Sequence, residues 1–201
     1  METITTICIT GCAASGKSTI VQKLQNDLRE ITALDLIVLP ETATELLQAG
    51  FSSSSNKLLF QRKLFQLQLA KELVYRNYVL ETRRPALLLL DRSALDGKIY
   101  LEPSEFESIL LENNITVNEI LKSIDIVIQL APAPAYNREK NNAYRLESSV
   151  DEILEQDRDL KRVYSVHPNY HYIESTVDFQ EKYDRVLKII EDYQSERISG
   201  D

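Results

Sequence analysis

The sequence predicts an α/β domain built on a doubly wound, five-stranded parallel sheet with helices on both faces. Apolar runs of strand length alternate with amphipathic helical stretches along the chain, which is the pattern of this class. The run Ala86–Leu90 is unbroken and ends on Asp91, as expected of a central parallel strand that helices cover on both sides. With 201 residues, the chain is long enough for one such core and short for two, so we expect a single domain over residues 1–201.

The expected elements follow from hydrophobic periodicity and from helix-ending residues. We expect strands at about residues 3–10, 35–39, 86–91, 125–130 and 170–174. We expect helices at about residues 17–30, 42–49, 57–81, 104–113, 117–123, 147–166 and 179–193. Ligands of such sheets bind beyond the carboxyl ends of the strands. The residues just past each strand are therefore candidates for a site, and we expect the second strand to lie beside the first.

The composition limits the partners of the protein. The net charge of −8 argues against extended binding to nucleic acid, because phosphate neutralisation needs concentrated Lys and Arg. No apolar run reaches membrane-spanning length, and no secretory signal follows Met1. Cys8 and Cys12 are too few and too close together to frame a disulfide scaffold. We expect a cytoplasmic protein with small-molecule partners and no membrane contact, and nothing in the sequence specifies its oligomeric state.

Residues 11–18 follow the pattern G-x-x-x-x-G-K-S, between the first expected strand and the first expected helix. The glycines let the backbone curl so that successive N–H groups face phosphate oxygens, and the helix presents its positive N-terminal end to the same anion. We expect Lys17 to reach the β- and γ-phosphates and Ser18 to bind Mg²⁺. The residues expected to contact the nucleotide here are Gly11, Ala13, Ala14, Ser15, Gly16, Lys17, Ser18 and Thr19.

Asp91 and Arg92 follow the third expected strand. Phosphoryl transfer needs a metal ion and positive charge where negative charge accumulates. Asp91 suits the water shell of Mg²⁺, because that ion prefers one or two carboxylates together with waters and phosphates. The planar fork of Arg92 suits a transferring or acceptor phosphate. The alternative is a charge pair at the surface end of a strand.

Glu41 follows the second expected strand and is a candidate base. Its carboxylate suits removal of the proton of an attacking hydroxyl, or contact with the substrate. The alternative is a carboxylate at a helix start, where the helix dipole favours it. Phe60 and Gln61 are candidates for substrate binding, because an amide pairs with a planar base and an aromatic ring stacks on it. Helical spacing also makes the region around them partly core.

The segment 132–147 is a candidate lid. It follows the fourth expected strand, has proline at its hinge and carries Arg138 and Arg145. A lid that folds over a nucleotide excludes water and brings cationic side chains to the phosphates. We expect Arg145 to act in catalysis and Arg138 to bind the nucleotide. The alternative is an ordinary solvated loop.

With these residues placed, the chain resembles the P-loop kinase superfamily. Within it, the chain resembles the small AAA-domain-like ATPase and kinase proteins that include the ribosylnicotinamide kinase domain. The resemblance covers most of the chain, and it implies ATP as phosphoryl donor and Mg²⁺ as the metal ion. The segments that carry it are residues 11–18, Pro40–Ala43, Phe60-Gln61, Leu90–Ser93 with Asp96, Arg145-x-Glu147, and Val163-Tyr164 followed by Tyr172-Ile173.

The chain is also similar to deoxynucleoside kinases, whose Phe-Gln and Glu-Arg-Ser motifs look like Phe60-Gln61 and Asp91-Arg92-Ser93. This resemblance implies that Glu41 is the base and that Gln61 reads a nucleobase. The chain departs from those enzymes by having Asp at position 91 and a shorter stretch between Glu41 and Gln61. Thymidylate kinases share an Asp-Arg pair, which leaves a nucleoside monophosphate as an alternative acceptor.

The hypothesis from the sequence is an ATP- and Mg²⁺-dependent kinase. It moves the γ-phosphoryl group to a hydroxyl of a small metabolite, for which a nucleoside-like molecule is the candidate. The expected catalytic residues are Lys17, Glu41, Arg92 and Arg145, and the expected substrate-binding residues are Glu41, Phe60, Gln61 and Arg92. Two alternatives stay open: an NTPase or triphosphate phosphohydrolase in which Glu41 activates water, and a nucleotide-gated switch that controls a partner.

Overall fold

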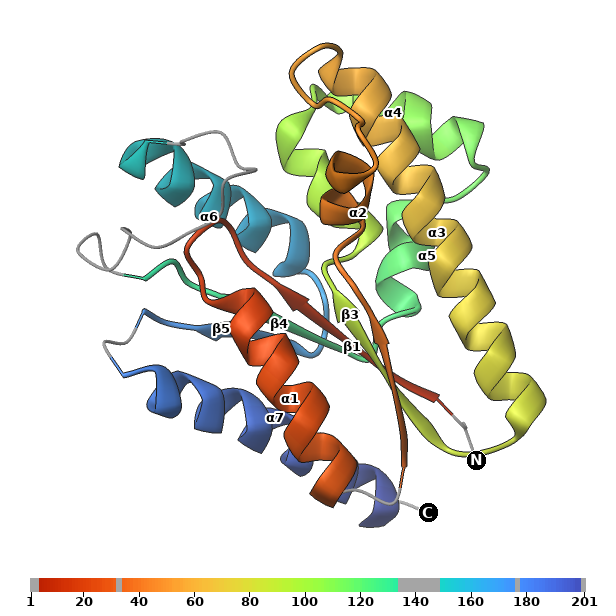
Figure 1. Ribbon diagram of the computed structural model, residues 1–201, viewed down its shortest axis with the longest axis vertical. Coiled ribbons are helices and arrows are strands. Elements are labelled where there is room, and N and C mark those ends of the chain that lie inside the picture. The colour runs from red at the N-terminus through yellow and green to blue at the C-terminus, as the bar shows by residue number, and fades with distance from the viewer. Residues whose placement is uncertain (1–3, 32–33, 134–148, 176–177, 200–201) are drawn as a thin grey trace.

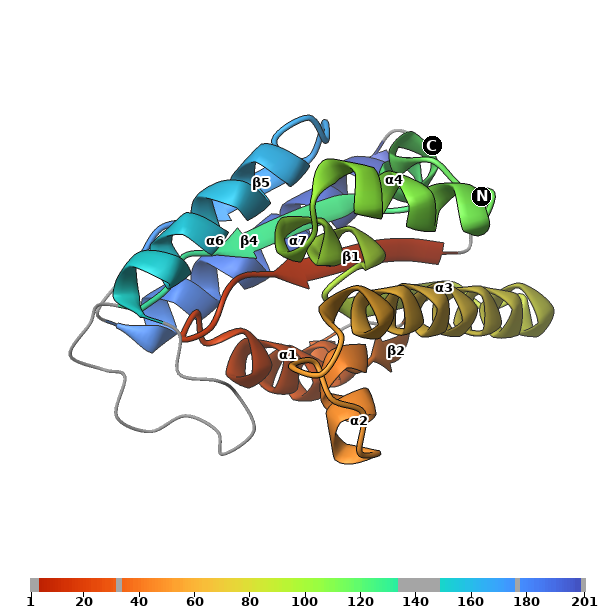
Figure 2. The same ribbon diagram turned by 90° about the horizontal axis from the view of Figure 1, so that it is seen from above.

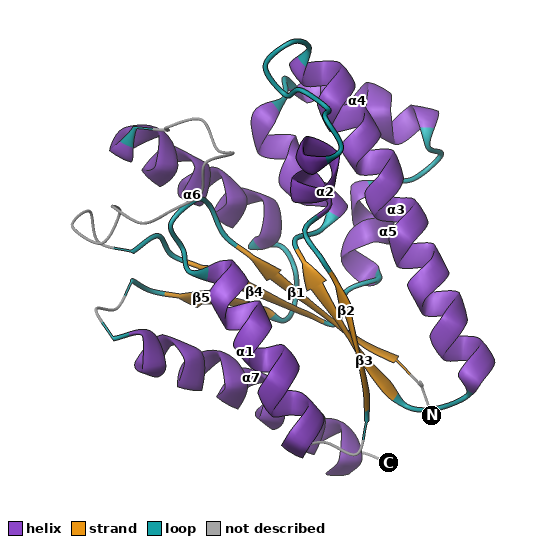
Figure 3. Ribbon diagram, in the orientation of Figure 1, coloured by secondary structure: helices purple, strands orange, loops and turns teal. Residues whose placement is uncertain are grey.

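The strands form one parallel sheet in the order β2-β3-β1-β4-β5. The computed structural model describes residues 4–31, 34–133, 149–175 and 178–199. The described strands are β1 (Ile4–Thr10), β2 (Asp35–Leu39), β3 (Ala86–Asp91), β4 (Ile126–Leu130) and β5 (Tyr170–Ile173). Helices lie on both sides of this twisted sheet (Figure 3), so the predicted fold class is confirmed.

The expectation that the second strand lies beside the first was wrong, because β3 lies between them. In the register of the sheet, Asp91 of β3 is opposite Ile9 of β1, and Leu90 of β3 is opposite Leu39 of β2. The hydrophobic pattern of a strand indicates whether the strand is buried but not which strands lie beside it. The order of the strands could therefore not be predicted from that pattern. The consequence is that Asp91 separates the end of β1 from the end of β2.

All the helices expected within the described residues are present, with small differences at their ends. They are α1 (Lys17–Ile31), α2 (Thr42–Gln48), α3 (Lys57–Thr82), α4 (Pro103–Glu112), α5 (Val117–Lys122), α6 (Val150–Tyr164) and α7 (Phe179–Ser199). The last helix therefore continues beyond Tyr193, where its end was expected. A 3₁₀ helix, η1 (Ala94–Tyr100), was not predicted. A capping box marks the start of this helix in the sequence. The Ser93 side chain accepts a hydrogen bond from Leu95 N–H, and the Asp96 side chain accepts one from Ser93 N–H.

One face of the sheet is covered by α1 and α7, which lie side by side (Figure 1). Ile20, Leu24 and Leu28 of α1 are fully buried there, together with Val186 and Ile190 of α7. Their spacing of four residues places them on one stripe of each helix. This packing holds the helix that follows the G-x-x-x-x-G-K-S segment firmly on the sheet.

The opposite face is covered by α3, α4, α5, α6 and η1. Phe65 of α3 meets Phe106 of α4 edge to face, with ring centroids 5.9 Å apart. Leu95 of η1 and Leu160 of α6 are fully buried in the same core. The core therefore fixes η1, which follows the carboxyl end of β3 where a site was expected, and α6 packs against η1.

Candidate active site

The segment 11–16 forms a loop between β1 and α1 whose backbone depends on glycine. The φ angles are +152° at Gly11, +59° at Ala14 and +80° at Gly16. A Cβ atom on Gly11 would lie 2.7 Å from the carbonyl oxygen of Leu130 and 2.8 Å from Ser15 Oγ. A side chain at position 11 is therefore excluded. A loop in which residues of positive φ are interspersed with residues of ordinary φ turns backbone N–H groups toward one side, and this makes a concave anion site.

Lys17 is the first residue of α1 and points into the site rather than into solvent. Its side chain is 3% exposed, and its Nζ donates a hydrogen bond to Asp91 Oδ1 and lies 3.8 Å from Glu41 Oε1. Burial, followed by the charge of Arg92, lowers the pKa of the Lys17 ammonium. The structure thus brings together two residues expected from different strands, Glu41 and Asp91, around this ammonium group.

Arg92 joins two carboxylates. Its Nε donates to Glu41 Oε1 at 2.7 Å, and its Nη1 donates to Asp96 Oδ2 at 2.9 Å. Burial alone would lower the pKa of Arg92, but the charges of Asp96 and Glu41 outweigh it and the net direction is upward. Asp91 itself is buried, so the alternative of a surface charge pair at positions 91 and 92 is wrong.

The backbone of Arg92 is left-handed, with φ +75°, a conformation that residues other than glycine rarely adopt. Its N–H donates to the Ile9 carbonyl at 3.0 Å, which extends the ladder between β1 and β3 by one step. Gln68 of α3 donates its Nε2 to the Arg92 carbonyl at 3.3 Å. Such strain persists only where the surroundings impose it, and it turns the Arg92 side chain toward Glu41.

Asp96 belongs to the site, although no role was predicted for it from the sequence. It is 4% exposed and accepts hydrogen bonds from Thr10 Oγ1 at 2.7 Å and from Tyr164 Oη at 2.5 Å, besides the one from Arg92. Tyr164 also shares a 2.7 Å hydrogen bond with Ser93 Oγ. Burial, and then the charge of Asp96, raises the pKa of the Tyr164 hydroxyl, so it stays a donor. Asp96 therefore links β1, η1 and α6.

The backbone around Glu41 is held by α3, against which α2 lies (Figure 2). Lys71 Nζ donates to the Pro40 carbonyl at 3.1 Å and to Glu45 Oε1 at 2.6 Å. Glu41 is the N-cap residue of α2, but its side chain makes no capping hydrogen bond. It accepts from Thr44 Oγ1 at 2.6 Å and from Arg92 instead. This arrangement favours a site role for Glu41 over that of a helix-start carboxylate.

A cavity of about 570 Å³ opens beside these charges. Glu41 and Arg92 line it on one side, and Phe60 and Gln61 of α3 line it on another. Gln61 is 9% exposed, and its Oε1 has no hydrogen-bond partner among the described residues. The cavity also reaches Ala13, so it is continuous with the phosphate loop. A buried acceptor atom without a partner favours a ligand that brings an N–H or O–H donor.

The residues expected to bind Mg²⁺ suit that ion. Ser18 is exposed at the start of α1, and the Asp91 carboxylate lies at the end of the neighbouring β3. Within the described part of the chain, no group of three or more His, Cys, Asp or Glu side chains is placed to hold a metal ion by itself. One hydroxyl and one carboxylate fit an ion that takes its other ligands from waters and phosphates.

Two expected residues are outside this description. Arg138 and Arg145, with the segment from 134 to 147 of the expected lid, lie outside the described residues. Ala13, Gly16 and Thr19 lie at the phosphate loop and the first turn of α1, where the sequence placed them.

None of the helices in the described ranges is both long and apolar enough to cross a membrane.

The fold and the phosphate loop together define a nucleotide-binding P-loop protein of the kinase and NTPase class. Residues 6–182 match the model of a family described as an AAA domain, and the chain belongs to that family. This confirms the resemblance to AAA-domain-like proteins that the motifs indicated. No curated protein matches the chain.

Two solved structures are similar to the chain. One is the NadR protein in complex with NAD and AMP-PNP, with a TM-score of 0.63 and 16% identity over 96% of this chain and 50% of that chain. The other is deoxyadenosine kinase from M. mycoides with dCMP and dCDP, with a TM-score of 0.62 and 14% identity over 93% of this chain and 99% of that chain. The chain thus spans half the length of the NadR chain, and at these identities the likeness concerns the fold.

Proposed function

We propose that the protein is an ATP- and Mg²⁺-dependent kinase that phosphorylates a hydroxyl of a small, nucleoside-like metabolite. The observation that carries this proposal is that one cavity joins the phosphate loop to Glu41, Arg92 and Gln61. A hydrolase needs room for one water molecule beside the γ-phosphate, whereas about 570 Å³ suits a whole organic acceptor. The AAA domain family and the kinase among the similar structures also support it.

In the proposed reaction, the acceptor hydroxyl oxygen attacks the γ-phosphorus of ATP. The bond from that phosphorus to the bridging oxygen of ADP breaks, and Glu41 takes the hydroxyl proton. Lys17 Nζ lies 3.8 Å from Glu41 Oε1. In the proposed reaction it faces the phosphates and neutralises the negative charge that develops on them. Arg92 orients Glu41 and holds the acceptor side of the cavity.

Ser18 and Asp91 are the residues proposed to hold Mg²⁺. When bound, the ion supplies positive charge that neutralises the β- and γ-phosphates. Asp91 accepts a hydrogen bond from Lys17. Phosphate oxygens would attract Lys17, which leaves the Asp91 carboxylate to the metal ion and its waters.

We propose one domain over residues 1–201, with a lid in segment 132–147 from which Arg145 reaches the transferring group and Arg138 the nucleotide. The net charge of −8 supports small-molecule partners over nucleic acid, and the free cysteines Cys8 and Cys12 support a place in the cytoplasm.

The test is whether ADP formation depends on an acceptor. The purified protein is incubated with Mg²⁺ and ATP, and ADP is measured with and without a mixture of nucleosides and nucleoside monophosphates. The proposal predicts that the mixture raises the rate of ADP formation at least about tenfold over the rate with water alone. An equal rate with and without the mixture would favour the hydrolase, and equally slow formation with tight nucleotide binding would favour the switch.

A further inference from the structure

Two carbonyl groups of the phosphate loop are held from outside the loop. The Ala133 N–H donates to the Ala14 carbonyl at 2.8 Å. Lys182 Nζ donates to the Ser15 carbonyl at 3.1 Å and to the Ala131 carbonyl at 2.8 Å. These donors come from the segment that follows β4 and from α7, and they lie 119 and 167 positions away in sequence from their phosphate-loop partners. Consecutive carbonyls of the loop are thus fixed by distant parts of the chain.

Lys182 is buried in a rigid setting. It lies in the first turn of α7, is 4% exposed, and precedes Tyr183, which is buried on the same helix. The Tyr183 hydroxyl donates to Asp27 Oδ2 of α1 at 2.6 Å, and the Lys23 ammonium of α1 lies 4.1 Å from the centre of the Tyr183 ring. Helix α7 is therefore joined by these side-chain contacts and by the shared core to α1, the helix that follows the phosphate loop (Figure 1).

The partners of Lys182 are neutral. Its ammonium donates to the two backbone carbonyls, and Cys12 and Asp157 act on its charge only at longer range. Burial lowers the pKa of the Lys182 ammonium, which means that its surroundings do not fully compensate the charge. A buried cation that is held by carbonyl dipoles beside an anion site adds to the positive potential of that site.

Peptide geometry explains what the held carbonyls do. The peptide bonds of the described residues are trans, so each carbonyl and the N–H of the following residue point in opposite directions. With the Ala14 and Ser15 carbonyls directed outward to their donors, the N–H groups of Ser15 and Gly16 are directed to the inner side of the loop. That inner side is the concave anion site described above.

We infer that Lys182 is a positioning residue for the nucleotide phosphates: it fixes the Ser15–Gly16 peptide so that the Gly16 N–H faces the phosphate, and it adds its charge behind the loop. This role rests on the proposed function, in so far as that function requires phosphate binding here. Because the same ammonium also holds Ala131, it ties the phosphate loop to the end of β4, where the chain leaves for segment 132–147.

The test compares three variants for binding of ADP and of inorganic tripolyphosphate. Lys182→Met removes the donors and the charge, Lys182→Gln keeps a donor and removes the charge, and Lys188→Met changes an exposed lysine of the same helix. We expect both Lys182 variants to lose roughly tenfold in affinity for each ligand, and Lys188→Met to stay within about twofold of wild type. Thermal unfolding is followed in parallel, and affinities are compared where each variant is folded.

The outcomes distinguish failure of the proposed function from failure of the role of Lys182. If wild type binds neither ADP nor tripolyphosphate, the proposed function fails. If wild type binds both and the folded Lys182 variants bind equally well, the role of Lys182 is wrong and the proposed function stands.

A second measurement needs no variant. In isotope-labelled wild type, the amide signal of Gly16 should move when tripolyphosphate is added, and the ammonium protons of Lys182 should stay protected from exchange before and after the addition. An unchanged Gly16 signal at saturation, or a Lys182 ammonium that exchanges as fast as that of Lys188, would overturn the inference.

Discussion

Arg92 and Glu41 form a hydrogen-bonded ion pair in which Nε of Arg92 donates to Oε1 of Glu41 at 2.7 Å. Both side chains are mostly buried, and both line the same cavity. The pair fixes the carboxylate that we propose as the base, on the wall between the acceptor cavity and the phosphate loop. Its geometry leads to the first two predictions.

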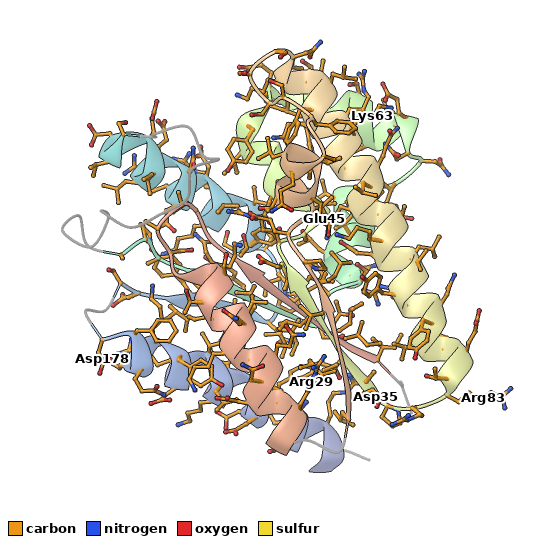
Figure 4. The ribbon with its side chains drawn as sticks, viewed as in Figure 1. Arg29, Asp35, Glu45, Lys63, Arg83 and Asp178 are labelled. Atoms are coloured by element: carbon orange, nitrogen blue, oxygen red, sulfur yellow. The ribbon has the colours of Figure 1, made fainter. Side chains whose placement is uncertain are left out.

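Replacing Glu41 with glutamine should separate catalysis from binding. Glutamine keeps an oxygen that accepts from Arg92 but does not take a proton at neutral pH. We expect turnover to fall by at least about 100-fold, while the affinity for ATP changes less than about threefold. The control is Glu45→Gln (Figure 4). Glu45 lies one helical turn after Glu41, and its half-exposed carboxylate accepts a hydrogen bond from Lys71 of α3. Equal losses of turnover and ATP affinity in Glu41→Gln would remove Glu41 from the role of base.

Replacing Arg92 with methionine should destabilise the fold as well as abolish activity. The change leaves the buried carboxylates of Glu41 and Asp96 without their shared cation. Loss of one partner from such a group costs about 3 kcal/mol in the free energy of unfolding. The control is Arg83→Met, because Arg83 also has a left-handed backbone, with φ +53°, but extends into solvent at the end of α3 (Figure 4).

Denaturant unfolding of the two arginine variants makes this comparison. We expect Arg83→Met to change the free energy of unfolding by less than about 0.5 kcal/mol. Similar losses in both variants would mean that backbone conformation, and not the paired carboxylates, makes position 92 sensitive.

Replacing Tyr164 with phenylalanine should disturb the site from the side of α6. The hydroxyl donates to Asp96 and is hydrogen bonded to Ser93, and both partners are buried. We expect a loss of about 1–2 kcal/mol in the free energy of unfolding, because Asp96 loses one of its donors. We also expect a lower kcat with an unchanged KM for ATP, since Asp96 holds Arg92. An unaltered kcat in steady-state kinetics would show that Asp96 keeps Arg92 in place without Tyr164.

Replacing Gly97 with alanine should act on the acceptor alone. A Cβ atom at this position would lie 2.9 Å from Gln61 Oε1, so the Gln61 amide must move. We expect the KM for the acceptor to rise by about three- to tenfold and the KM for ATP to stay unchanged. The ATP constant is the internal control in the same experiment. A rise in both constants would mean that the change distorts the phosphate loop, contrary to a separate acceptor subsite.

The two cysteines should be unreactive in the folded protein. Burial, and then the charge of Asp157, raises the pKa of the Cys12 thiol to about 12, and burial also raises that of Cys8. At pH 8 the folded state therefore holds almost no thiolate, whereas roughly a tenth of unfolded thiols ionise at their ordinary pKa of 9.0. Because the folded state binds these protons more tightly, their contribution to stability is complete below about pH 9 and is lost as the pH rises toward 12.

Thiol labelling at pH 8 with an aromatic disulfide reagent tests this point. We expect slow labelling of the native protein at the rate of its unfolding, and fast labelling in denaturant. Fast labelling of Cys12 in the native protein would mean that the phosphate loop opens well below the energy of global unfolding.

The elements of the fold were predictable because each one is encoded locally. The unbroken apolar run of β3 and the helical stripes of α1 and α7 are patterns that a few neighbouring residues define. The position of β2 was not predictable in this way, because strand order depends on contacts between residues such as Leu39 and Leu90 that no local pattern records. The 3₁₀ helix η1 was not predicted, although Ser93 and Asp96 have the spacing of a capping box, which indicates a helix start.

The site was predictable where a motif carries the chemistry. The phosphate loop, Glu41 and Arg92 were found from their residue types and from their places after strands, and the structure brings them together. Asp96 appeared only within a motif, and Tyr164 and Lys182 had no assigned role. Their contacts arise from pairs of residues 68 and 167 positions apart, which only the folded chain reveals.

The central claim is that a phosphoryl group passes from ATP to a hydroxyl of a small acceptor. The measurement that tests it most directly uses γ-labelled ATP with Mg²⁺, with and without a pooled metabolite extract, followed by separation of the labelled products. The account predicts label on a new small molecule, in amounts that Glu41→Gln strongly reduces. Label in free phosphate alone, at the same rate with and without the extract, would contradict it.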